Sequence, residues 1–111
     1  LRAELSIQPE FCFDTETTGL DPHSSELVCL SFSFRKHEAF CVTLPKGREE
    51  TARIVNEFRE IFEDERIMKI GQNLKYDMLM LRQYGIEVRG QMFDTMLAHY
   101  LIQGILKPFW T

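Results

Sequence analysis

The chain has 111 residues and a composition, 44% apolar and 27% charged, that is typical of one globular domain. It contains no apolar run near the roughly 20 residues of a membrane-spanning helix, and its first residues lack the pattern of a secretory signal. These features favour a cytoplasmic protein without membrane contact. The net charge of −4 counts against nucleic-acid binding through a basic face alone. It is compatible with an acidic site whose bound cations meet a phosphate.

Three strands are predicted in the first half of the chain. Glu10–Glu16 is rich in aromatic and β-prone residues and leads into a glycine-containing turn at Thr17–Pro22. Glu26–Arg35 alternates polar and apolar residues, and Ala39–Leu44 lies between a charged turn and Pro45. Because short links join consecutive strands, we expect an antiparallel meander.

The second half alternates between helices and strands. Apolar residues recur at helical spacing over Arg48–Asp64, which predicts an amphipathic helix packed on a sheet. The elements predicted after it are the strand Ile67–Gly71, the helix Leu74–Tyr84, the weaker strand Val88–Phe93 and the helix Thr95–Ile102. The order βββαβαβα indicates an α/β fold, a mixed sheet with helices on its faces, as in ribonuclease H-like folds. We expect one domain over residues 1–111.

The cysteines Cys12, Cys29 and Cys41 are odd in number, lie in apolar strand-like contexts and show no CxxC spacing. This pattern suggests neither a disulfide framework nor a zinc site. We expect three buried, reduced thiols.

Two acidic residues end the first predicted strand, in the segment FDTETTGLDP. Asp14 and Glu16 stand two apart, so both side chains point to the same face of the strand. Two neighbouring carboxylates repel each other unless a cation lies between them, and Mg²⁺ or Mn²⁺ would meet that need. The alternative is an acidic pair at a solvated strand end.

A third acid lies in IGQNLKYDMLML, on the helix predicted from Leu74. Asp77 falls at the margin of the apolar stripe of that helix, where an unpaired carboxylate would lose hydration. Lys75 lies on another side of the helix and is poorly placed to pair with it. Asp77 is therefore predicted to share a metal with Asp14, and a hydrogen-bonded structural aspartate is the alternative.

Together, FDTETTGLDP, then IGQNLKYD, and a strand leading into FDTMLAHYLI resemble the 3′→5′ exonuclease domain of bacterial family A DNA polymerases. These domains belong to the wider DnaQ-like, or DEDD, group that includes ribonuclease D. The similarity covers roughly residues 5–103. It implies a proofreading domain that acts on the single-stranded 3′ end of DNA during replication or repair, beside a polymerase domain of the same parent chain.

The resemblance also implies roles for individual residues. Two divalent ions, Mg²⁺ or Mn²⁺, would be held by the catalytic acids Asp14, Glu16 and Asp77. The residues that it places against the substrate are Thr17 and Leu20 at the terminal nucleotide, and Gln72, Asn73 and Tyr76 along the strand.

The sequence departs from the family pattern toward its end. The family completes its site with Tyr or His followed four residues later by Asp, and no such motif occurs here. Residues 104–111, GILKPFWT, do not resemble the family's continuation. We therefore expect a partial domain with little or no activity of its own, and exposed apolar surface that favours self-association.

Two other functions stay open, namely a ribonuclease D-like RNA exonuclease and a catalytically inactive nucleic-acid-binding module. Asp94, which directly precedes the predicted helix Thr95–Ile102, could replace a metal ligand. We instead predict that its side chain caps the free N–H groups of that helix.

Overall fold

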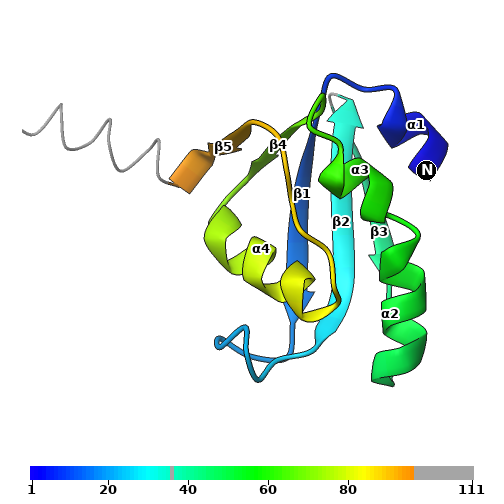
Figure 1. The fold of residues 1–111 in the computed structure, drawn as a ribbon, viewed down its shortest axis with the longest axis vertical. Helices are drawn as coiled ribbons and strands as arrows, with labels where there is room; N and C mark the ends of the chain where they lie inside the picture. The colour runs from blue at the N-terminus through cyan, green and yellow to red at the C-terminus, as the bar shows by residue number, and fades with distance from the viewer. Residues whose placement is uncertain (36, 97–111) are drawn as a thin grey trace, which may run out of the picture.

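A five-stranded mixed sheet forms the centre of the chain, and the computed structural model describes residues 1–35 and 37–96. The strand order is β3-β2-β1-β4-β5 (Figure 1). The strands are β1 (Glu10–Thr17), β2 (Leu27–Arg35), β3 (Glu38–Thr43), β4 (Met68–Gly71) and β5 (Met92–Asp94). The first three form the predicted antiparallel meander, whereas β4 pairs parallel to β1 and β5 parallel to β4.

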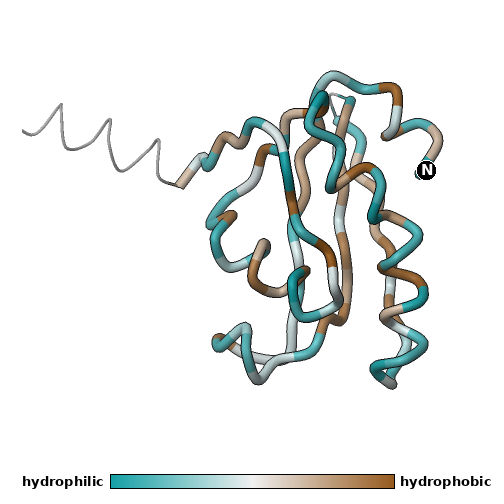
Figure 2. Tube along the Cα trace, in the orientation of Figure 1, coloured by the Kyte–Doolittle hydropathy of each residue, from teal (hydrophilic) through white to brown (hydrophobic). Residues whose placement is uncertain are grey.

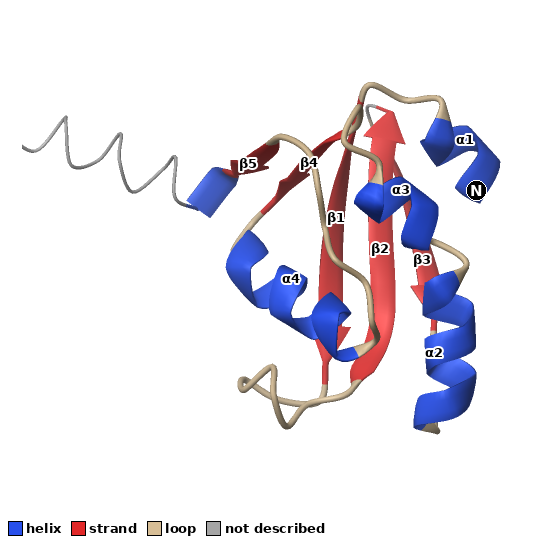
Figure 3. Ribbon diagram, in the orientation of Figure 1, coloured by secondary structure: helices blue, strands red, loops and turns tan. Residues whose placement is uncertain are grey.

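The described helices are α1 (Arg2–Ser6), α2 (Arg48–Asn56), α3 (Arg59–Glu63) and α4 (Leu74–Gln83). Figures 1 and 3 show α3 and α4 in front of the sheet, with α2 beside them and α1 next to α3. We call the sheet face that these helices cover the helix face. The opposite face, which we call the open face, carries no helix within residues 1–35 and 37–96.

Strand β1 divides its residues between these two faces. Phe11, Phe13 and Thr15 are buried, while Asp14 and Glu16 between and after them are exposed. This alternation follows from the two-residue period of a β-strand. The residues that point to the helix face are therefore the apolar ones and Thr15, and both acids point to the open face.

The core on the helix face is largely aromatic. The ring of Phe62 in α3 lies 5.8 Å from that of Phe11 and 5.0 Å from that of Phe13, both in edge-on contact. Phe58, just before α3, stacks on Phe32 of β2 at 5.1 Å. These contacts hold β1 against the helices. The strand that carries Asp14 and Glu16 on one face is therefore supported by packed aromatic rings on the other. Figure 2 shows that apolar and hydrophilic residues alternate along α2, as in an amphipathic helix.

Two predicted elements differ from the structure. The single helix Arg48–Asp64 is wrong, because the chain forms α2 and α3 with a tightened turn between them in which the N–H of Phe58 donates to the carbonyl of Val55. The predicted strand Val88–Phe93 is displaced to Met92–Asp94. Gly90, at φ +95°, turns the chain there, and a β-carbon would lie 2.9 Å from the Ile67 carbonyl oxygen.

The prediction that all three cysteines are buried is also wrong. All three are free, but only Cys29 is buried, and Cys12 and Cys41 are exposed. Cys12 alternates with Phe11 and Phe13 in β1, so it points to the open face, which lacks a covering layer in the described residues. The apolar context of a strand does not reveal which of its two faces is covered.

The structure adds a helix at the start of the chain that was not predicted, and it describes only part of the last predicted helix. The short helix α1 was not predicted; its residue Leu5 is fully buried in the core. Of the predicted helix Thr95–Ile102, Thr95 and Met96 are helical, and residues 97–102 lie outside the described residues. The tail 104–111 also lies outside them.

Lys69 of β4 is a fully buried cation on the helix face. Its Nζ donates to the carbonyl of Asp64 at 2.6 Å and to that of Arg89 at 2.5 Å. Burial lowers the pKa of this lysine to about 8. By joining the segment before β4 to the segment before β5, Lys69 holds the parallel edge of the sheet together.

Candidate functional site

The two acids of β1 lie side by side on the open face. Asp14 is paired with Ser31 of β2, and Glu16 with Cys29. Asp14 lines a groove of about 310 Å³ on this face, together with residues of β2 and of the turn after β4, among them Ser33 and Gln72. The predicted common face of Asp14 and Glu16 is therefore confirmed, and Gln72 lies on the same groove as Asp14.

The third acid, Asp77, is held next to the same strand. It lies in the first turn of α4, and its Oδ1 accepts a hydrogen bond from the Thr15 hydroxyl. Strand β4 pairs with β1 only as far as Cys12, opposite Ile70, so the later part of β1 has an edge that β4 leaves uncovered. Asp77 reaches Thr15 in this part of β1, between Asp14 and Glu16 in the sequence.

The surroundings of Asp77 disfavour its charge. The side chain is 2% exposed, and its Oδ2 is the one buried polar side-chain atom without a hydrogen-bond partner among the described residues. Burial, opposed by the Thr15 hydrogen bond and supported by the negative charge of Asp14, raises the pKa of Asp77 to about 7. A buried carboxylate oxygen needs a partner, and a cation, a proton or a water molecule can each supply one.

The three acids do not form one cluster in the described residues. Asp14 and Glu16 are exposed on the open face, whereas Asp77 is buried beside Thr15. Across residues 1–35 and 37–96, no three His, Cys, Asp or Glu side chains are grouped so that they could hold a metal ion. The structure thus brings Asp77 to the strand of the other two acids but not to a common point with them.

Four of the five predicted substrate-binding residues line a second pocket, of about 440 Å³. These are Thr17, Leu20, Asn73 and Tyr76. The Tyr76 hydroxyl lies 2.5 Å from the Thr17 hydroxyl and donates to the carbonyl of Gly19 at 2.7 Å, so α4 holds the loop that follows β1. Leu20 is 96% exposed at the rim. The spacing of residues in the sequence did not predict this pocket. Its residues were predicted only from the resemblance to the exonuclease domains.

The sequence did not predict a role for Thr15 in this site, nor the long-range contacts of Asp94. Thr15 lies between two acids in the sequence, and only the contact with Asp77, 62 residues away, gives it a role. Asp94 accepts the N–H of Met96 at 2.9 Å, which agrees with the predicted cap, but it also accepts the N–H groups of Asn73 and Leu74. No local sequence signal indicates these long-range contacts.

Sequence comparison assigns the family. The chain matches the DNA polymerase A family described as "3′-5′ exonuclease" over residues 1–106. The chain belongs to this exonuclease family. Relatives of the exonuclease domain include DNA polymerase I of Borreliella burgdorferi, 37% identical over 92 residues, which is 80% of this chain and 10% of the relative. DNA polymerase I of Pseudomonas aeruginosa is 33% identical over 81% of this chain and 11% of the relative. The exonuclease domain thus spans about a tenth of the length of these curated relatives.

Solved structures confirm the fold of the exonuclease domain. Brucella melitensis NrnC, in a structure with bound Mg²⁺, is 24% identical with a TM-score of 0.70, and the match covers 89% of this chain and 47% of NrnC. A further structure shows NrnC bound to pGG, with a TM-score of 0.71 and 23% identity over 94% of this chain and 49% of that chain. These neighbours share the ribonuclease H-like α/β fold that was predicted. None of the helices in the described ranges combines the length and the apolar content needed to cross a lipid bilayer.

Proposed function

We propose that the chain is the acid-bearing part of a 3′→5′ exonuclease that removes nucleotides from the single-stranded 3′ end of DNA. The parent chain would carry a polymerase domain and act in the bacterial cytoplasm, as a proofreading enzyme of the DNA polymerase I type. Membership of the family and identities of 30% or more to DNA polymerase I support the substrate and the partner domain. The observation that carries the proposal is the buried, unpartnered Asp77 Oδ2 beside the strand of Asp14 and Glu16.

The chemistry of the three acidic side chains suits hard divalent cations, although the three carboxylates do not meet at one point among the described residues. Carboxylate oxygens are the ligands that Mg²⁺ and Mn²⁺ prefer, and the unpartnered Oδ2 of Asp77 is available to one. Asp14, Glu16 and Asp77 would hold two such ions. When bound, a pair of these ions supplies an activated water on one side of phosphorus and stabilises the leaving oxygen on the other.

The chain's own residues would bind and orient the DNA end. The pocket of Thr17, Leu20, Asn73 and Tyr76 adjoins the end of β1 that carries Glu16, so a terminal nucleotide there would place its phosphate near the acids. The exposed Leu20 side chain offers an apolar surface for a base. Gln72, on the groove with Asp14, would contact the strand beside this nucleotide.

By itself, the 111-residue chain is expected to be weakly active or inactive. Its sequence lacks the Tyr or His and the fourth acid of the family's third motif, so metal affinity and the position of the water should both suffer. We accordingly regard residues 1–111 as a partial exonuclease domain. Met92, Phe93 and Met96 are 37%, 49% and 52% exposed, and this apolar group near β5 would favour self-association of the isolated chain.

A nuclease assay on the parent chain tests the proposed function. Single-stranded DNA and RNA of the same sequence, labelled at the 5′ end, would be incubated with Mn²⁺. We expect DNA to shorten stepwise from its 3′ end, faster than RNA, with no shortening in EDTA. Faster degradation of RNA would favour the ribonuclease D-like alternative. Binding of DNA and RNA without cleavage of either would favour an inactive binding module.

Replacement of Tyr76 tests the binding pocket. Tyr76→Phe removes the hydrogen bonds to Thr17 and Gly19, so we expect the free energy of unfolding to fall by about 1 kcal/mol. Because the loop after β1 loses its anchor, KM for single-stranded DNA should rise several-fold. Urea denaturation and steady-state kinetics measure the two effects.

A second tyrosine provides the control. Tyr84 does not line the pocket, but it accepts the N–H of Leu27, the strand partner of Thr17, at 3.0 Å. Tyr84→Phe should therefore lower stability similarly and raise KM less than Tyr76→Phe does. An equal rise of KM in both variants would contradict a specific role for Tyr76.

A further inference from the structure

Helix α4 begins without a cap of its own. Its N-cap residue, Asn73, has left-handed backbone angles of φ 62° and ψ 51°, and its side chain makes no capping hydrogen bond. The first N–H groups of a helix have no partner within the helix and need acceptors from elsewhere. The start of α4 therefore depends on a residue outside it.

Asp94 supplies these acceptors from the end of β5. Its Oδ1 accepts the N–H of Asn73 at 3.1 Å, and its Oδ2 accepts the N–H of Leu74 at 2.9 Å. Asp94 can reach both groups because it is paired with Gly71, the last residue of β4. The turn from β4 to α4 is tight at this point: a β-carbon on Gly71 would lie 2.6 Å from the Leu74 side chain.

The residues that follow Leu74 are those of the proposed site. Tyr76 and Asp77 lie in the first turn of α4, where a change in helix direction displaces their side chains directly. Asp77 contacts Thr15, and Tyr76 contacts Thr17, so α4 aligns both with consecutive parts of β1. Whatever fixes the first turn of α4 also fixes these two contacts.

We propose that Asp94 is a positioning residue of the exonuclease site, which sets the direction of α4 and thereby places Asp77 and Tyr76 against β1. This inference rests on the proposed function, in which Asp77 holds metal. Both carboxylate oxygens of Asp94 accept backbone N–H groups at the start of α4, and these contacts orient the helix.

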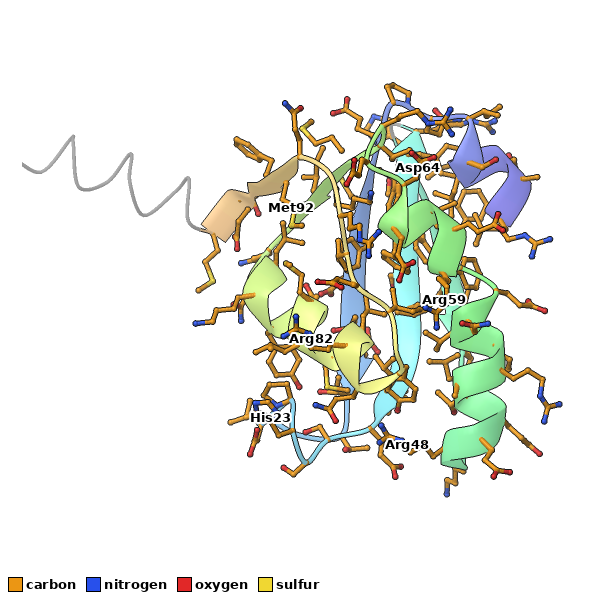
Figure 4. All side chains as sticks on the ribbon, in the orientation of Figure 1. His23, Arg48, Arg59, Asp64, Arg82 and Met92 are labelled. Carbon is orange, nitrogen blue, oxygen red and sulfur yellow. The ribbon has the colours of Figure 1, made fainter. Side chains whose placement is uncertain are left out.

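The alternative interpretation is that Asp94 acts only as a local cap at the end of β5. Oδ1 of Asp94 also accepts the N–H of Met96, two residues later, at 2.9 Å. Asp64 makes the same local contact, since its Oδ1 accepts the N–H of Arg66 at 2.9 Å. In Figure 4 Asp64 lies at the end of α3, apart from Met92 at the start of β5. Asp64→Asn is thus a matched control that alters a local turn without touching α4.

Three variants distinguish the positioning role from the local cap: Asp94→Asn, Asp94→Ala and Asp64→Asn. In the 111-residue chain, amide exchange would be followed by NMR and Mn²⁺ affinity by titration. In the parent chain, kcat and KM for single-stranded DNA would be measured at a temperature where every variant is folded. Asn keeps one acceptor oxygen and Ala keeps none, so a graded effect is expected.

For Asp94→Asn, we expect the amides of Asn73 and Leu74 to exchange about tenfold to a hundredfold faster, because hydrogen bonds to a charged group are lost. Mn²⁺ affinity should fall about tenfold or more, as with other residues that orient metal ligands. We expect kcat to fall by a similar factor and KM to change less, and Asp94→Ala to exceed Asp94→Asn in each effect. Asp64→Asn should alter none of the three.

The inference is overturned if Asp94→Asn matches Asp64→Asn in exchange of Asn73 and Leu74, in Mn²⁺ affinity and in kcat. It is also overturned if exchange accelerates while metal affinity and kcat stay at wild-type values. Failure of the proposed function looks different: Asp14→Asn would then leave nucleotide release unchanged, whatever the exchange of the α4 amides.

Discussion

Asp14→Asn is expected to reduce nucleotide release by the parent chain about a thousandfold. In the proposed function Asp14 is a metal ligand, and its loss would remove several kcal/mol of charge stabilisation from the transition state. Asp14 is exposed on the open face and lines the groove there, so the substitution leaves the core intact. Single-turnover release from labelled single-stranded DNA in saturating Mn²⁺ measures the effect on chemistry. Circular dichroism would confirm that the fold is retained.

Glu10→Gln is the matched control for this substitution. Glu10 is an exposed acid on the same strand and, four residues earlier, on the same face as Asp14. It lies outside the groove that Asp14 lines, so nucleotide release should stay within about twofold of wild type. A loss of less than about tenfold for Asp14→Asn, or an equal loss for Glu10→Gln, would remove Asp14 from the proposed site.

Asp77→Asn is expected to stabilise the metal-free chain and to abolish nucleotide release by the parent chain. Burial raises the pKa of Asp77 to about 7 from an ordinary value of 3.8. Below about pH 4 the residue is protonated in both the folded and the unfolded chain. As the pH rises toward 7, the unfolded chain releases this proton more readily than the folded chain, so the contribution of Asp77 to stability is lost. Asparagine is neutral and can still accept the Thr15 hydrogen bond.

Urea denaturation in EDTA at pH 5 and pH 8 measures this effect. At pH 8 the variant should exceed wild type by a few kcal/mol, on the order expected for a buried carboxylate, and the difference should shrink at pH 5. In Mn²⁺ the order should reverse, because wild type gains metal-binding energy and the variant does not. A variant less stable than wild type at pH 8 in EDTA would show that the Asp77 carboxylate is not destabilised by burial.

Asp64→Asn gives a control of opposite sign. Arg66 holds the pKa of Asp64 down, at about 2, by side-chain and backbone hydrogen bonds. Stability from Asp64 is therefore present above about pH 4 and is lost as the pH falls toward 2. We expect Asp64→Asn to destabilise the chain at pH 8 by a small amount, since this ion pair is at the surface and solvent screens it.

Local periodicity was enough to predict the meander and the common face of Asp14 and Glu16. A strand of period two places residues 14 and 16 together whatever lies around it. The burial of Asp77 beside Thr15 could not be predicted in this way, because it depends on where β4 stops pairing with β1, after Cys12. The same limit applies to Asp94, whose acceptors serve N–H groups about twenty residues earlier.

Errors in the predicted elements have a related cause. Helical spacing continues through Glu57 and Phe58, and neither Gly nor Pro marks the break between α2 and α3. Phe58, which lies in this break, stacks on Phe32 of β2. Exposure of Cys12 and Cys41 depends on which face of the sheet the helices cover. In each case the residues that pack against the segment are distant from it in sequence, so the local sequence pattern cannot predict the contact.

The order of pairing in the sheet has a consequence for how the chain folds. Strands β1, β2 and β3 close through short connections, whereas β1 meets β4 across a long stretch of chain, with Glu10 opposite Met68. Short loops lose less entropy on closure, so we expect the meander to form first and the parallel pairing to follow. Asp14 and Glu16 would then be held by a hairpin while Asp77 is still in an unfolded segment. Acquisition of the third acid would coincide with the last folding step, so an incompletely folded or newly synthesised chain would carry two of the acids without a working nuclease.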